Sequence, residues 1–128
     1  MFPIGIHQFT GKIMNKNICF QALKLKDQIV LWIGMDNDPT FKDLSLAMST
    51  AYEKSPTSVK IMGDTSSLTS STLAVRLSKR IQKPVFVSFN ISENNQEMFT
   101  GIEERLLEEI MLAPECFWEI SNFLHTLQ

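Results

Sequence analysis

Ile29-Val30-Leu31-Trp32-Ile33 is the stretch that decides the fold. All five residues are apolar, so an extended chain would be apolar on both faces at this point. Strands with this pattern lie in the interior of a sheet whose two sides are both covered. The sequence therefore predicts a central strand over residues 29–33 with both of its faces covered.

Two further strands are predicted immediately before the central one. Residues 6–14 and 18–26 have strand composition and are separated by residues that favour turns. Gly11 suggests a β-bulge within the first of these strands. Because the connections are short, the three successive strands are expected to form an antiparallel meander that ends at residues 29–33.

The second half of the chain is expected to contain both strands and helices. From residue 44 to residue 49 every second position is leucine or methionine, which favours a strand, although the composition would also permit a helix. The remaining predictions are a short strand at 59–61, a helix over 69–82 capped by Thr69 or Ser70, a strand over 85–91, a helix over 96–112 and a further helix from Pro114.

Each predicted helix has one apolar stripe that can pack on a sheet. The stripes consist of Leu73, Ala74, Leu77 and Ile81, then Phe99, Ile102, Leu106 and Ile110, and finally Phe117, Ile120, Phe123, Leu124 and Leu127, with Trp118 outside the last stripe. We therefore predict one α/β domain of the α+β type over residues 1–128. It would have about six mainly antiparallel strands, in a sheet or sandwich, flanked by two to three helices, with residues 118–128 as a helical C-terminal extension.

Composition limits the classes of function that the chain can have. The 128 residues are 44% hydrophobic with a net charge of -2, which fits a single packed domain and argues against binding nucleic acid through overall charge. The longest apolar run, residues 29–35, is too short to span a bilayer, and no signal peptide is recognisable. Cys19 and Cys116 are far apart, so we expect two buried free thiols in a soluble intracellular protein without a membrane partner.

The candidate chemical motifs are incomplete. Gly63-Asp64-Thr65-Ser66 could bind an anion before a helix, but it lacks the second glycine and the lysine of a phosphate-binding loop, so a capping turn is the simpler interpretation. Asp36-x-Asp38 lacks the glycine and glutamate of a calcium loop. His7 and His125 are the only histidines, and no metal or nucleophile motif includes them. We predict no catalytic residue, cofactor or metal, and a small enzyme that acts on a phosphorylated ligand remains a rival hypothesis.

Charged residues gather on the predicted helices. Arg76, Lys79, Arg80 and Lys83 would project from about a quarter of one helix, either as a solvated face or as a docking site for an acidic partner. Glu103, Glu104, Glu108 and Glu109 would form an acidic face on the next helix, which could meet a basic partner. The four basic residues are our candidate partner-binding site.

Four segments, at their spacing, resemble the proteasome assembly chaperone family, and within it the fourth type of chaperone. They are Leu31-Trp32-Ile33-Gly34, Gly63-Asp64-Thr65-Ser66, Val85-Phe86-Val87-Ser88-Phe89-Asn90 and Pro114-Glu115-Cys116-Phe117. The loop from Met35 to Lys42 is slightly longer than the family pattern, and Trp118 to Gln128 extends beyond it.

The resemblance implies a small chaperone without an active site. It would pair with a structurally similar third chaperone, bind α-type subunits of the proteasome core particle, and promote assembly of the α-ring in the cytoplasm and also in the nucleus. A small protein-binding adaptor of trafficking or signalling complexes is the alternative that the same composition allows.

Overall fold

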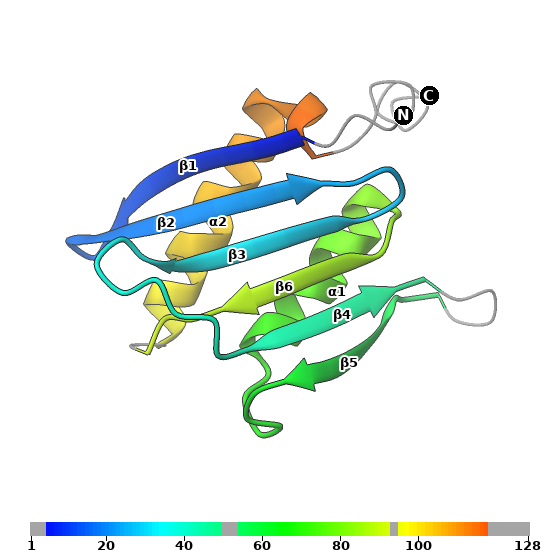
Figure 1. Cartoon of the computed structure of the whole chain (residues 1–128), viewed down its shortest axis with the longest axis horizontal. Coiled ribbons are helices and arrows are strands. Elements are labelled where there is room, and N and C mark those ends of the chain that lie inside the picture. The colour runs from blue at the N-terminus through cyan, green and yellow to red at the C-terminus, as the bar shows by residue number, and fades with distance from the viewer. Residues whose placement is uncertain (1–4, 50–53, 93–94, 118–128) are drawn as a thin grey trace.

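Six strands form one sheet, and two helices lie on one of its faces (Figure 1). The computed structural model describes residues 5–49, 54–92 and 95–117. In chain order the elements are β1 (Gly5–Ile13), β2 (Lys16–Lys24), β3 (Ile29–Met35), β4 (Leu44–Met48), β5 (Thr57–Met62), α1 (Thr69–Ile81), β6 (Val85–Phe89), α2 (Gln96–Leu112) and the 3₁₀ helix η1 (Pro114–Cys116). The predicted helical extension over 118–128 lies outside the described residues.

The sheet is mixed but mainly antiparallel, as predicted. Its strand order is β1-β2-β3-β6-β4-β5, in which β3 and β6 run parallel and the other four neighbouring pairs run antiparallel. The β1–β2–β3 meander is confirmed, and residues 44–48 form a strand, not a helix. The sequence analysis left open whether the strands form one sheet or a sandwich of two sheets. The elements make a single sheet with one helical layer, so the single sheet is correct.

The predicted bulge at Gly11 is wrong. The β1–β2 register runs without a shift from Gly5 opposite Lys24 to Ile13 opposite Lys16. A glycine is nevertheless required at position 11, because a Cβ there would lie 2.8 Å from Cγ of Arg105 on α2. Gly11 therefore allows a close approach of the helix and does not interrupt the ladder.

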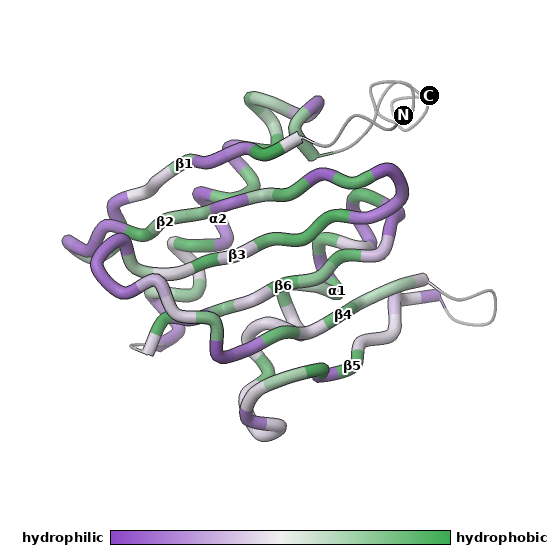
Figure 2. The backbone as a smooth tube through the Cα atoms, in the orientation of Figure 1, coloured by the Kyte–Doolittle hydropathy of each residue, from purple (hydrophilic) through white to green (hydrophobic). Residues whose placement is uncertain are grey.

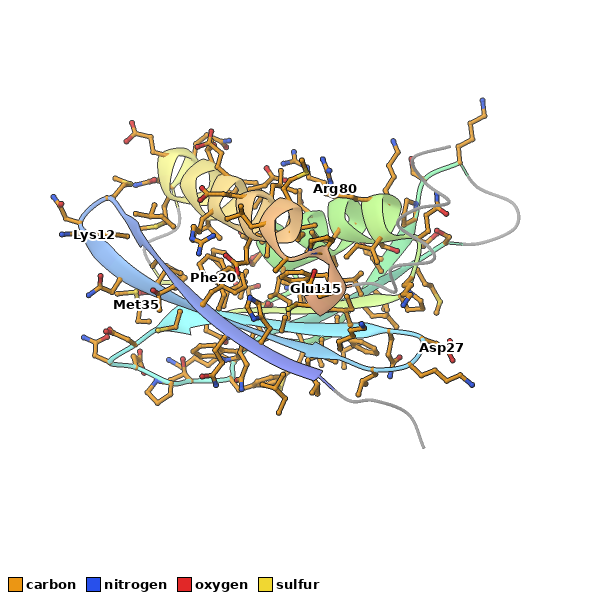
Figure 3. The ribbon with its side chains drawn as sticks, turned by 90° about the horizontal axis from the view of Figure 1, so that it is seen from above. Lys12, Phe20, Asp27, Met35, Arg80 and Glu115 are labelled. Carbon is orange, nitrogen blue, oxygen red and sulfur yellow. The ribbon has the colours of Figure 1, made fainter. Side chains whose placement is uncertain are left out.

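The hydrophobic core fills the space between the sheet and the helices (Figure 3). The predicted stripe of α1 is buried at Leu73, Ala74, Leu77 and Ile81, and the β6 face is buried at Val85, Val87 and Phe89. On α2 the buried residues are Met98, Ile102, Leu106 and Ile110, so Met98 takes the inward place that was predicted for Phe99, which is half-buried. Phe117 is also buried, at 2% exposure, against this core.

Two helix ends differ from the prediction. Leu68 occupies the N-cap of α1 without a side-chain capping bond, and Thr69 and Ser70 lie inside the helix. The Ser70 hydroxyl is instead buried, 2.7 Å from the hydroxyl of Ser45, and it accepts a hydrogen bond from Lys60. Pro114 begins the short helix η1, so a 3₁₀ turn replaces the predicted α-helix in the described part of this segment.

The two sides of the sheet are covered unequally. Ile29, Leu31 and Ile33 of β3 face the helices and are buried, as expected for a central strand. Among the described residues no helix covers the opposite side, which Figure 1 views directly, so this part of the chain supplies only one of the two predicted covers. Figure 2 shows hydrophobic residues along β3 and β6, and hydrophilic ones at the turn between β2 and β3.

Candidate partner-binding surface

The predicted basic stripe does not form one surface. Arg76 lies on α1 and donates a hydrogen bond from Nη1 to Oε1 of Glu103 on α2 at 2.6 Å, and its guanidinium carbon lies 5.6 Å from the centre of the Phe99 ring. These contacts join the two helices across their outer surface. Arg76 is therefore engaged within the chain, although its side chain is 55% exposed.

The other three basic residues have different environments. Lys79 and Arg80 are exposed in the last turn of α1, where positive charge offsets the partial negative charge at the helix C-terminus. Lys83 follows the helix, and its ammonium nitrogen is buried with no hydrogen-bond partner among the described residues. Only Lys79 and Arg80 thus present charge freely to an incoming partner, and their role in binding stays a prediction.

The acidic face of α2 is divided in the same way. Glu103 pairs with Arg76, whereas Glu109 accepts hydrogen bonds from His7 at 2.6 Å and from Arg105 at 2.9 Å. Burial opposes the charged form of Glu109, but the bonds from His7 and Arg105 outweigh it and hold the pKa of this carboxyl below its ordinary value. Glu104 and Glu108 remain exposed as the acidic pair on the outer surface of α2.

The Gly63–Ser66 turn is closed by its own aspartate. The Asp64 carboxylate accepts hydrogen bonds from the Ser66 hydroxyl at 2.7 Å and from the Ser66 N–H at 2.9 Å, and these bonds lower the pKa of Asp64. The N–H group that an anion would need is therefore already donated to a negative charge. This geometry argues against the phosphorylated-ligand hypothesis at this turn.

The groups that would support other chemistry are dispersed. Within residues 5–49, 54–92 and 95–117, no three histidine, cysteine or acidic side chains are grouped so that they could hold a metal ion. Cys19 and Cys116 are free thiols but half-buried, not buried as predicted, and burial raises the pKa of each. No helix in the described part of the chain has the length and apolarity needed to cross a bilayer.

The side of the sheet that faces away from the helices carries many apolar side chains, and we call it the open face. Strand alternation defines it, because Ser45 and Lys60 bond Ser70 of α1 and their strand neighbours must point the other way. Large exposed side chains on this face include Ile6 at 64%, Met48 at 42% and Val59 at 55% exposure. The apolar residues of the open face are Ile6, Leu23, Val30, Trp32, Leu46, Met48, Val59 and Phe86, and the same registers place the polar residues Gln8, Thr10, Lys12, Gln21 and Ser88 on it.

Trp32 organises one half of the open face. Its indole N–H donates to the carbonyl of Thr40 at 2.9 Å and so holds the loop between β3 and β4 against the sheet. The loop and the strands enclose a hollow of about 520 Å³, which we call the Trp32 hollow. It is lined by Ile6, Gln21, Leu23, Val30, Trp32, Pro39, Thr40 and Phe41.

The comparisons with known proteins identify the family. Residues 17–91 match the model of the family described as proteasome assembly chaperone 4. The chain is 33% identical over 114 residues to human proteasome assembly chaperone 4, covering 89% of this chain and 91% of the human protein. The chain belongs to the proteasome assembly chaperone 4 family. The mouse protein of the same name matches with the same identity and coverage.

A solved structure supports the fold of this family member. One chain of a crystallised chaperone complex for yeast 20S proteasome assembly superposes with a TM-score of 0.58, covering 86% of this chain and 95% of the yeast one. At 13% sequence identity this likeness shows the fold alone. The resemblance predicted from the four segments is confirmed by the family model and by the human relative.

The open face is a candidate partner surface that the sequence analysis did not assign to residues. The pattern of residues 29–33 did indicate that both faces of this strand are buried, because a strand with apolar residues on both faces needs packing partners on both. The sequence did not indicate that the second cover is absent from the described chain. Ile6, Trp32 and Phe41, which meet around the hollow, belong to three separate segments.

Proposed function

We propose that this chain is a non-enzymatic chaperone that promotes assembly of the proteasome core particle. In this proposal it pairs with a related small chaperone, and the pair binds α-type subunits. Membership of the family and the likeness to human proteasome assembly chaperone 4 support the general function. The adaptor alternative is not favoured, because the family model and the human relative both belong to proteasome assembly chaperones.

The open apolar face is the observation that carries the pairing. An exposed, contiguous apolar patch on a folded domain marks an interaction site, because leaving it in water is unfavourable. A partner with an equivalent sheet would cover Ile6, Met48 and Val59 and give β3 its second cover. Two sheets packed face to face, about 10 Å apart, are a common arrangement in proteins. A related chaperone with the same fold therefore fits this face.

The outer surface of the two helices is the proposed binding site for the client, an α-type subunit. Lys79 and Arg80 on α1 and Glu104 and Glu108 on α2 present charges of opposite sign on the outer surface, and Figure 3 shows Arg80 on the side away from the sheet. Charged rims give specificity and fast association without great affinity. An α-type subunit bound there would be held in a competent state and kept from wrong neighbours. It would leave when the stronger contacts of the ring replace this interface.

The two surfaces lie on opposite sides of the sheet, so both partners can be bound at once. The chaperone pair would act in the compartments where core particles assemble, and we propose the cytoplasm and the nucleus. No chemical step is needed in this mechanism, because selection among neighbours comes from mass action and from the difference between two affinities.

The test is affinity purification of the tagged chain from its own cells, followed by native mass spectrometry. We expect a related chaperone of similar size and α-type subunits in stoichiometric amounts. The variant Val59→Asp places a charge on the open face and should lose the small chaperone while circular dichroism shows an intact fold. Recovery of neither component with the unsubstituted chain would refute the proposal.

A further inference from the structure

The Trp32 hollow is formed before any partner arrives. The Trp32 ring lies over Gly34, where a Cβ atom would overlap its six-membered ring. Its N–H fixes the carbonyl of Thr40, and the far end of the loop is held by a 2.8 Å bond from the Lys42 N–H to Oδ1 of Asn90. A wall fixed at two points loses little freedom on binding, so the hollow is preorganised.

The lining defines the chemistry of the occupant. None of the eight side chains around the Trp32 hollow is ionisable, and all but Gln21 and Thr40 are apolar. An ionic group would lose its hydration there without gaining a charged partner. A volume of about 520 Å³ exceeds what one methyl group would fill. The hollow therefore fits a large uncharged side chain.

A second hollow, with more polar residues in its lining, lies beside the first. It measures about 480 Å³, shares Gln21 and Trp32 with the first, and is lined in addition by Phe9 and Phe20 and by Gln8, Thr10 and Cys19. An apolar group on one side of Trp32 and a hydrogen-bonding group on the other would satisfy both hollows. This difference favours an occupant whose hydrogen-bonding group lies toward Gln8 and Thr10.

We propose that the Trp32 hollow receives a large aliphatic or aromatic side chain from the sheet of the partner chaperone, and that this side chain anchors the pair. The inference rests on the proposed function, since the hollow is continuous with the open face. Anchors of this kind dominate binding energy because they fill desolvated pockets near the centre of an interface, and tryptophan is enriched among them. The loop between β3 and β4, slightly longer than the family pattern, then selects the partner by shaping the wall.

The first experiment truncates the wall. Phe41 is 52% exposed and lies outside the strands, so Phe41→Ala should leave the fold intact. We expect this change to raise the Kd for the purified related chaperone of the same organism by about tenfold or more, measured by isothermal titration calorimetry. Leu112→Ala is the matched control, because it removes an apolar side chain that is 71% exposed on α2, and it should leave the Kd unchanged.

The second experiment observes the hollow directly. The sequence holds two tryptophans, so Trp118→Phe leaves Trp32 as the only indole emitter. Its emission should shift to shorter wavelength when the partner chaperone binds, because the ring loses water. A Phe41→Ala variant that binds as tightly as the parent, or binding without a change in Trp32 emission, would overturn the anchor but leave the proposed function standing if Val59→Asp still abolishes pairing. Absence of binding by the unsubstituted chain would overturn both.

Discussion

Gly34→Ala tests the arrangement of Trp32 through a single methyl group. Gly34 is buried in β3 with an ordinary strand backbone, so alanine fits the main chain there, but its Cβ would overlap the Trp32 ring. The ring must then move and release the Thr40 carbonyl, to which it donates at 2.9 Å. Overpacking costs about 1–3 kcal/mol and a lost hydrogen bond about 0.5–1.5 kcal/mol. Alanine also lowers the conformational entropy of the unfolded chain, which stabilises the fold by about 0.4–1 kcal/mol.

The expected net loss in the free energy of unfolding is about 2 kcal/mol, measured by urea denaturation. Gly5→Ala is the matched control, because the nearest atom to its added Cβ would be at 3.9 Å, an ordinary contact. The decisive measurement is a double-mutant cycle, in which Gly34→Ala should cost almost nothing when Trp32→Ala has already removed the ring. The same cost in both backgrounds would show that the ring does not occupy the space above Gly34.

Three further predictions concern the hydrophobic core, the loss of stability at acidic pH and the surface proposed to bind α-type subunits. Leu77→Ala should lower the free energy of unfolding by about 2–5 kcal/mol, because Leu77 is only 4% exposed, and a loss below about 0.5 kcal/mol would contradict its place in the core. The lowered pKa of Glu109 stabilises the fold at neutral pH, and that contribution is lost as pH falls below the ordinary glutamate value of about 4.3. In the Glu109→Gln variant, the denaturant midpoint should therefore fall less steeply as pH is lowered. An unchanged fall would show that Glu109 does not cause the loss of stability at acidic pH. Lys79→Glu combined with Arg80→Glu should weaken capture of α-type subunits in pull-downs while pairing with the small chaperone persists, and equal capture at physiological salt would remove the basic residues from the client site.

The elements that depend on local pattern were predictable. The helix expected over 96–112 is observed over the same residues, and the one expected over 69–82 ends one residue earlier. Both helices have one clear apolar stripe, and α2 also has Asn95 as an N-cap whose side chain accepts from the Met98 N–H. Periodicity and capping act within a few residues, so a single sequence contains the signal.

The features that failed depend on contacts between distant segments. Ser70 could cap α1 by local rules, but its hydroxyl bonds Ser45, which lies 25 positions away. Arg76 was expected on a free basic stripe, and it pairs with Glu103, 27 positions along the chain. Gly11 was interpreted as a bulge because its true neighbour, Arg105, comes from the opposite end of the described chain. Local rules cannot rank such competing partners.

The open face shows the same limit at the level of the whole domain. A strand pattern that is apolar on both faces indicates that both faces will be buried, but it does not indicate which molecule will bury them. In the described chain, α1 packs on β4 and β6 and α2 packs on β1, all on one face. The apolar residues of the other face therefore need a cover that this part of the chain does not supply. In our proposal that cover is a second sheet from a related chaperone, and the hollow beside Trp32 is the place where this sheet would be anchored.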